Sequence, residues 1–188
     1  MKRRNCIHSA CINEEQLGIM NLFRMLWEQH VNWTRAFIVS ALAGLEDLDV
    51  VTGRLLRNPA DFTNILKQYY GYEKAAEFER LLRAHLLLAA DLLNAAKAGE
   101  EEAAQLACRK WYHNASEIAH FLSDINPYWN EDQWKTQLFD HLSMVEEIVT
   151  LRMAGKFEEE TVVSDMNEQR ALSMADYMAA GIIKQFTL

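Results

Sequence analysis

The sequence predicts an all-α protein: an up-and-down antiparallel four-helix bundle with an additional C-terminal helix and a short helical connector. Three observations predict this class. Half of the 188 residues are apolar, and only 7 Gly and 2 Pro interrupt the chain. Apolar residues recur at helical spacing, and no stretch of any length alternates as a strand would. The scarce helix breakers fall between the periodic segments, at Gly44, Gly71, Gly99, Pro127 and Gly155.

The N-terminal half is expected to hold one long helix and a helical connector. Residues 14–45 carry the first apolar stripe, which ends at Gly44 and an acidic stretch. Residues 49–71 then read as two short helices. Pro59 is typical of a first helical turn and Gly71 of a helix stop. The connector therefore links two long helices.

The rest of the chain predicts four further helices. They lie at residues 73–98, 100–123 and 131–154, with a last one from Thr161 or Ser164 to about Gln185. Gly99 suits a C-terminal cap, and the residue before Pro127 is pushed out of the α region. Asn130 suits an N-cap, with acidic residues in the first turn after it. Because the links are short, neighbouring helices should run antiparallel.

Residues 14–188 are expected to form a single domain, preceded by a flexible tail over residues 1–13. The tail contains Cys6 and Cys11 with His8 between them. Two thiolates and one imidazole without a second cysteine pair make a poor zinc site. The role of this tail stays open.

Charge and hydropathy exclude several classes of partner. The formal charge is −8 and the basic residues are scattered, whereas nucleic-acid-binding proteins present a basic face. No apolar run approaches the roughly 20 residues of a membrane span, and no signal peptide is evident. We therefore expect a cytoplasmic protein with neither nucleic acid nor membrane as its partner. A small ligand, a metal ion or a second copy of the chain stays open as partner.

A polar layer is predicted at the centre of the bundle. Placed at about 100° per residue, His30, His85 and His141 each lie near the centre of an apolar stripe and near mid-helix. Asn114 takes the equivalent place on the third long helix, and Glu117 borders the same face. Since mid-helix positions share a level in an antiparallel bundle, these side chains should meet. The predicted metal site comprises His30, His85, Glu117, His141 and Asn114, with Asn114 as a ligand or as a partner of one.

A metal ion gives this layer a physical reason, because an unpartnered buried imidazole costs a few kcal/mol. Histidine and glutamate suit a divalent metal such as Fe, Zn or Mn, which could do Lewis-acid or redox work at an open coordination position. Whether Asp176 joins the site stays open. A di-iron centre is not expected, because the chain has a single Glu-x-x-His, from Glu117 to His120, and His120 falls on the outer face.

Two other interpretations stay open. The histidine layer could serve only to set helix register in a non-enzymatic structural or interaction protein. Alternatively, a cavity in the middle of the bundle could bind a small ligand. A nucleotide cofactor is not expected, because no glycine-rich phosphate loop is present.

Four strings in the chain resemble a small family of helical proteins from Bacillus- and Clostridium-type bacteria. They are Leu26-Trp-Glu-Gln-His-Val-Asn-Trp-Thr-Arg35, Arg54-Leu-Leu-Arg-Asn-Pro59, Ala95-Ala-Lys-Ala-Gly99 and Ile125-Asn-Pro-Tyr-Trp129. The resemblance covers residues 21–186 and extends distantly to ferritin-like bundles. It implies a helical fold and a metal, but no particular reaction. Members of this family are often labelled acetylglutamate kinase, yet kinase activity is not expected without a phosphate loop.

Overall fold

The computed structural model describes residues 12–188, which form a bundle of α-helices and contain no strand. The all-α prediction is therefore confirmed. Residues 1–11, with Cys6, His8 and Cys11, lie outside the described residues. The helices are α1 (Glu14–Ala43), α2 (Leu48–Leu55), α3 (Asn58–Ala98), α4 (Glu101–Ile125), α5 (Glu131–Met153) and α6 (Phe157–Phe186).

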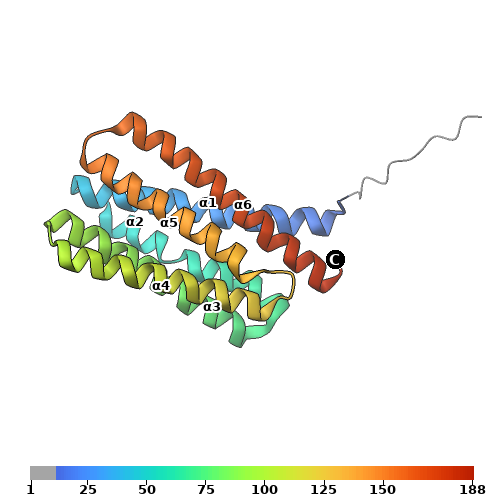
Figure 1. Ribbon diagram of the computed structural model, residues 1–188. Coiled ribbons are helices and arrows are strands. Elements are labelled where there is room, and N and C mark those ends of the chain that lie inside the picture. The colour runs from blue at the N-terminus through green and yellow to red at the C-terminus, as the bar shows by residue number, and fades with distance from the viewer. Residues whose placement is uncertain (1–11) are drawn as a thin grey trace, which may run out of the picture.

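The long helices pack side by side in chain order (Figure 1). Helix α3 packs on α4, α4 on α5 and α5 on α6, while α6 returns to cover α1. The short helix α2 lies against α1. The C-terminus ends beside the start of α1, where Gln16 Nε2 donates to the main-chain oxygen of Leu188 at 2.7 Å. The first and last helices therefore close the bundle.

Local sequence explains where most helices begin and end. Asn13 and Gln16 form a capping box at the start of α1, and the Asn130 side chain caps α5. Gly44 and Gly99 end α1 and α3 in the left-handed conformation, as the sequence predicts. The starts of α1 and α5 and the ends of α1 and α3 thus follow from cap residues.

Helix α3 contains a sharp break at Gly71, whose φ of 78° and ψ of 171° are non-helical. The two segments of α3 fold against each other there, because Thr63 Oγ1 donates to the main-chain oxygen of Ala75 at 3.3 Å. Phe62 and Phe78 also pack edge to face, with ring centroids 5.7 Å apart. The predicted connector therefore consists of α2 and the first segment of α3.

The last helix starts earlier than the sequence indicated, at Phe157 and not at Thr161 or Ser164. Gly155, at a φ of 72°, turns the chain directly after α5, and Lys156 is the only residue between that turn and α6. Glutamates 158 to 160 then occupy the first turn, where negative charge is favourable at a helix N-terminus.

A buried carboxylate joins α6 to two other parts of the bundle. Glu160 has a fully buried side chain and accepts two hydrogen bonds from Arg35 of α1, at 2.7 and 2.9 Å. Arg152 and Ser164 also donate to it, at 3.1 and 2.9 Å. Burial pushes the pKa of Glu160 up, but these hydrogen bonds and positive charges outweigh it and hold the pKa below its usual value.

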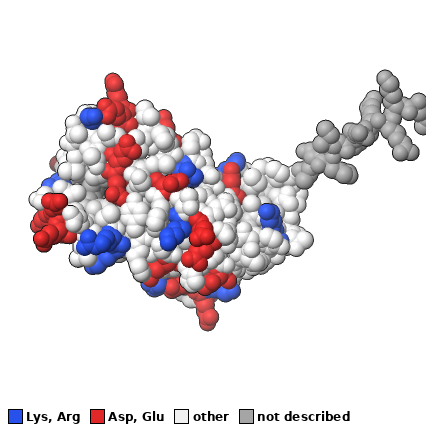
Figure 2. Space-filling view, in the orientation of Figure 1, with Lys and Arg blue, Asp and Glu red and all other residues white. Residues whose placement is uncertain are grey.

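The surface carries both signs of charge. Figure 2 shows acidic and basic side chains interspersed on one face, with no broad basic area there. No helix among residues 12–188 is long and apolar enough to cross a membrane.

Candidate metal centre

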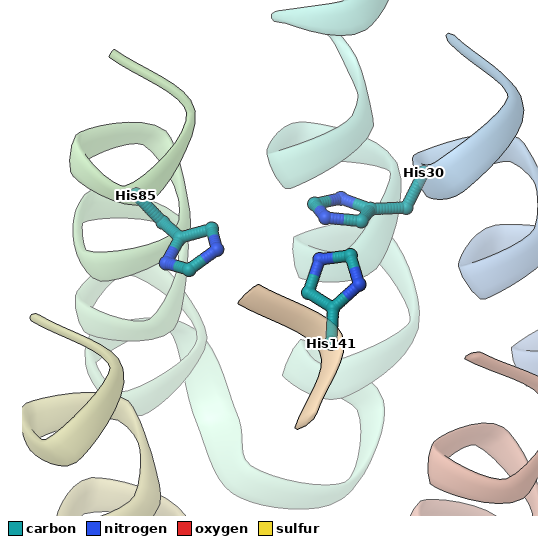
Figure 3. A group of neighbouring side chains, drawn as sticks. All are labelled: His30, His85 and His141. Carbon is teal, nitrogen blue, oxygen red and sulfur yellow. The ribbon is translucent and has the colours of Figure 1, made fainter. Parts of the chain in front are cut away.

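Three histidines from three helices meet inside the bundle. His30 lies on α1, His85 on the second segment of α3 and His141 on α5, and each is at most 2% exposed. Figure 3 shows the three rings turned toward one another. One ring nitrogen from each lies within 4.8 Å of the others. The structure therefore brings together a buried histidine triad that could hold a metal ion.

Helix geometry explains why the rings meet. Each histidine lies near the middle of its helical segment, and the apolar stripes around it direct the side chain to the bundle axis. The ring centroids of His30 and His141 are 5.5 Å apart, and His85 lies 6.3 Å from each. The three histidines therefore lie at the same level along the bundle, as the sequence predicts.

Each imidazole is held by an asparagine from the next part of the chain. The Nδ1 atom of His30 lies 3.1 Å from Asn58 Oδ1, at the start of α3. His85 pairs with Asn114 of α4 at 3.0 Å. His141 pairs in the same way, at 2.7 Å, with Asn167 of α6. All three asparagines are buried.

The asparagine amides fix which nitrogen carries the proton in two of the rings, those of His30 and His85. The Nδ2 atoms of Asn58 and Asn114 donate to the main-chain oxygens of Leu26 and Leu81, at 3.0 and 3.2 Å. Each of these leucines lies four residues before the paired histidine. The Oδ1 atom must therefore face the imidazole, and an amide oxygen only accepts. Nδ1 then carries the proton and Nε2 keeps its lone pair, as a metal-binding histidine requires.

Sequence analysis missed this arrangement of asparagines. Asn58 directly precedes Pro59, so the sequence marks it only as part of a helix start, and no sequence motif marks Asn167. A signal was nonetheless present, because each asparagine follows its histidine at a similar distance, 28, 29 or 26 residues along the chain.

Burial keeps the imidazoles neutral. Loss of hydration, followed by the charge of His141, lowers the pKa of His30 to about 3, while the hydrogen bond to Asn58 opposes the shift. Burial likewise lowers the pKa of His141 and, together with the neighbouring histidines, lowers that of His85 far below its usual value. At neutral pH the rings therefore carry no charge, and their Nε2 lone pairs are available.

A tryptophan occupies one of these lone pairs. The indole N–H of Trp111, on α4, donates to His85 Nε2 at 3.2 Å, and the two rings lie 5.3 Å apart. Within residues 12–188, no hydrogen bond reaches the Nε2 atoms of His30 and His141. A metal ion would thus meet two free nitrogens and one that Trp111 must release.

The other candidate ligands lie elsewhere. Glu117 does not join the site: its side chain is 48% exposed and lies 3.6 Å from His113 Nδ1 on the outer face of α4. Its position at the border of the apolar stripe allows this rotation to solvent. Asn114 holds His85 and is a partner of a ligand. Asp176 forms a surface ion pair with Arg24 at 2.6 Å, so it is not part of the triad.

No protein-family model matches the chain, and neither the curated proteins nor the solved structures contain a match. The functional argument therefore depends on the residues of this chain.

Proposed function

We propose that the protein binds one divalent transition-metal ion through the Nε2 atoms of His30, His85 and His141. One observation carries this proposal. Three buried, neutral imidazoles converge with their ligand nitrogens within 4.8 Å. Three imidazoles gathered without a bound group are a costly way to fill a core, because each buried polar ring needs a partner. A metal ion would bind the Nε2 atoms of His30 and His141 and would take the place of the Trp111 N–H at His85 Nε2.

The donor set favours zinc and, after it, ferrous iron. Neutral imidazole suits Zn²⁺ and Fe²⁺, whereas Mn²⁺ prefers oxygen ligands, and the triad contains no carboxylate. Zinc–nitrogen bonds of about 2.0–2.1 Å place tetrahedral ligand nitrogens about 3.3 Å apart. The ligand nitrogens lie within 4.8 Å of one another, so the rings would have to move closer together to bind a metal.

Three protein ligands leave one coordination position for water or a substrate. A metal bound in this way supplies Lewis acidity or, for iron, redox chemistry. The chain itself contributes the orientation of the rings. Asn58, Asn114 and Asn167 contact the Nδ1 atoms of the three rings. Trp27 packs against His30, and Trp111 packs against His85. We also propose that the protein is distantly related to ferritin-like proteins. A centre of three imidazoles would nevertheless differ from their di-iron carboxylate site.

A purely structural histidine layer is the second candidate. The asparagine partners support it, because they satisfy every Nδ1. The Nε2 atoms of His30 and His141 argue against it, since no hydrogen bond within residues 12–188 uses them. A layer built only to fix helix register would be expected to pair both nitrogens of each ring.

Elemental analysis of protein purified without a His tag tests the proposal. We expect about one metal ion per chain, either as purified or after addition of Zn²⁺ or anaerobic Fe²⁺. A metal content near zero that stays unchanged after adding Zn²⁺, Mn²⁺ or anaerobic Fe²⁺ would refute it. In that case the structural interpretation would stand.

A further inference from the structure

A cavity of about 130 Å³ adjoins the histidine triad. Its inner end is lined by residues next to the triad in the chain: Thr34 follows His30 by one helical turn, and Leu86 follows His85 directly. Trp111 belongs to both places, because it lines the cavity and donates to His85 Nε2 at 3.2 Å. The cavity and the triad are therefore separated by little more than this indole.

The lining of the cavity is almost entirely apolar. Thr34, Leu86 and Trp111 are each under 10% exposed and form the closed inner end. Glu146 is half-buried and Thr150 is exposed, so these two residues form the mouth. The cavity thus reaches from solvent to Trp111, the residue that donates to the ligand nitrogen of His85.

Few polar groups in the cavity are free to bind a ligand. The hydroxyls of Thr34 and Thr150 already donate to main-chain oxygens of their own helices, at 2.7 and 2.9 Å. Cys108 Sγ lies 3.9 Å from Glu146 Oε1, and burial followed by the charge of Glu146 raises the pKa of this thiol. The Glu146 carboxylate at the apolar mouth repels anions, whereas neutral molecules can enter the cavity.

We propose that this cavity is a binding site for a small, uncharged, apolar molecule about the size of benzene. An apolar protein cavity of about 150 Å³ stays dry and binds benzene or xenon, which sets the scale of the occupant. Compact pockets with apolar walls and few polar groups are the usual form of small-molecule sites. Binding depends on the cavity alone.

The cavity serves the triad as its substrate site, and this second step rests on the proposed metal function. A molecule seated at the inner end contacts Trp111, whose indole N–H must leave His85 Nε2 when a metal binds there. An atom of the bound molecule that carries a lone pair would face the open coordination position.

Thermal unfolding of the metal-free protein with benzene tests the binding step. We expect saturating benzene to raise Tm by about 2–5 °C, because a ligand that binds only the folded state stabilises it. Benzoate, which has the same ring with a negative charge, should leave Tm unchanged. Ala89→Leu fills the cavity from α3 and should abolish the benzene shift. Ala96→Leu does the same nearer the mouth, should the first variant not fold.

Ala103→Leu, on the exposed face of α4, is the matched control and should keep the full shift. An unchanged Tm of the unaltered protein with benzene would overturn the proposal. So would a shift that persists in both cavity-filling variants.

Pyridine added to the Co²⁺-loaded protein tests the link to the triad, because it has the shape of benzene and one lone pair. We expect pyridine to change the visible cobalt spectrum, and Ala89→Leu to bind cobalt without that response. A benzene shift together with a cobalt spectrum that ignores pyridine would refute the substrate role. A benzene shift in a protein that binds no metal would refute the metal proposal and support the binding site.

Discussion

At the scale of single residues, the triad depends on pairs of histidine and asparagine. The Oδ1 atom of each asparagine lies within hydrogen-bond distance of Nδ1 of one ring, which leaves Nε2 directed to the centre. Such partners orient a metal ligand and raise its basicity. The three histidines are interior positions that periodicity predicts. Their asparagine partners are not predictable in this way, because a helical wheel gives a direction and not the neighbour that lies there.

His85→Ala should abolish metal binding while the far-ultraviolet circular dichroism keeps its helical signal. The change removes one of three ligands, whereas the apolar neighbours of His85 still bury the helix. Metal content after dialysis against zinc is the measurement. His113→Ala, at an exposed position on α4, is the control and should bind metal normally. If His85→Ala unfolds the chain and the unaltered protein never contains metal, the layer is structural.

Asn114→Ala should weaken metal binding about 10–100-fold, the usual cost of losing the partner of a ligand. The asparagine holds the His85 ring by its Nδ1 proton, and without it the ring loses its orientation. Competition with a chromophoric zinc chelator measures the affinity. Asn94→Ala, an exposed position on α3, gives the comparison. Equal affinities for the two variants would show that the asparagine does not position the ligand.

At the scale of the elements, Gly71 allows α3 to supply both a partner and a ligand to the site. The first segment carries Asn58 and the second carries His85, and both reach the centre because the helix folds back between them. Its φ of 78° with a ψ of 171° is a region that essentially only glycine occupies. The connector therefore brings Asn58 into contact with His30.

Gly71→Ala should lower the free energy of unfolding by about 1–3 kcal/mol, the cost of forcing a side chain into this backbone region. Space is not the reason, since a Cβ at Gly71 would meet no atom within 4 Å. Gly53→Ala, in the regular helix α2 with equally open space, should instead stabilise by about 0.5–1 kcal/mol. Urea unfolding measures both. A stabilising Gly71→Ala would contradict the strain.

At the scale of the whole molecule, burial of the triad couples global stability to pH. Because the pKa of His30 is depressed in the folded state, the unfolded chain binds a proton there below about pH 6.5 and the folded state does not. The stability that the neutral His30 contributes to the fold is complete above that pH and is lost as pH falls toward 3. Glu160 acts in a lower window, because its depressed pKa stabilises the fold above about pH 4.5 and the effect disappears below it.

Acidification of the metal-free protein from pH 7 to pH 5 should therefore cost about 2 kcal/mol of unfolding free energy through His30 alone. Urea unfolding at the two pH values measures it. His30→Gln should show a smaller loss, because Gln does not titrate. His120→Gln should not reduce the loss, because nearby acids raise the pKa of this exposed histidine and its protonation favours the folded state. Equal stability of the unaltered protein at both pH values would contradict burial of neutral rings.

The sequence alone does not predict whether the side chains of Glu117 and Asp176 face the interior or the solvent. Both lie near apolar stripes of their helices, yet one turns to solvent beside His113 and the other pairs with Arg24. At the border of a stripe, a rotation of one side chain decides between interior and surface. The start of α6 shows the same limit, because an acidic first turn has no apolar periodicity to reveal it.

By itself, the sequence determined the helical class, most helix ends and the three interior histidines, because periodicity and caps act within one helix. Tertiary structure alone decided the asparagine partners, the exclusion of Glu117, the Trp111 contact and the cavity beside the triad. These features depend on how helices distant in the chain face one another, which is set by the packing of whole side chains.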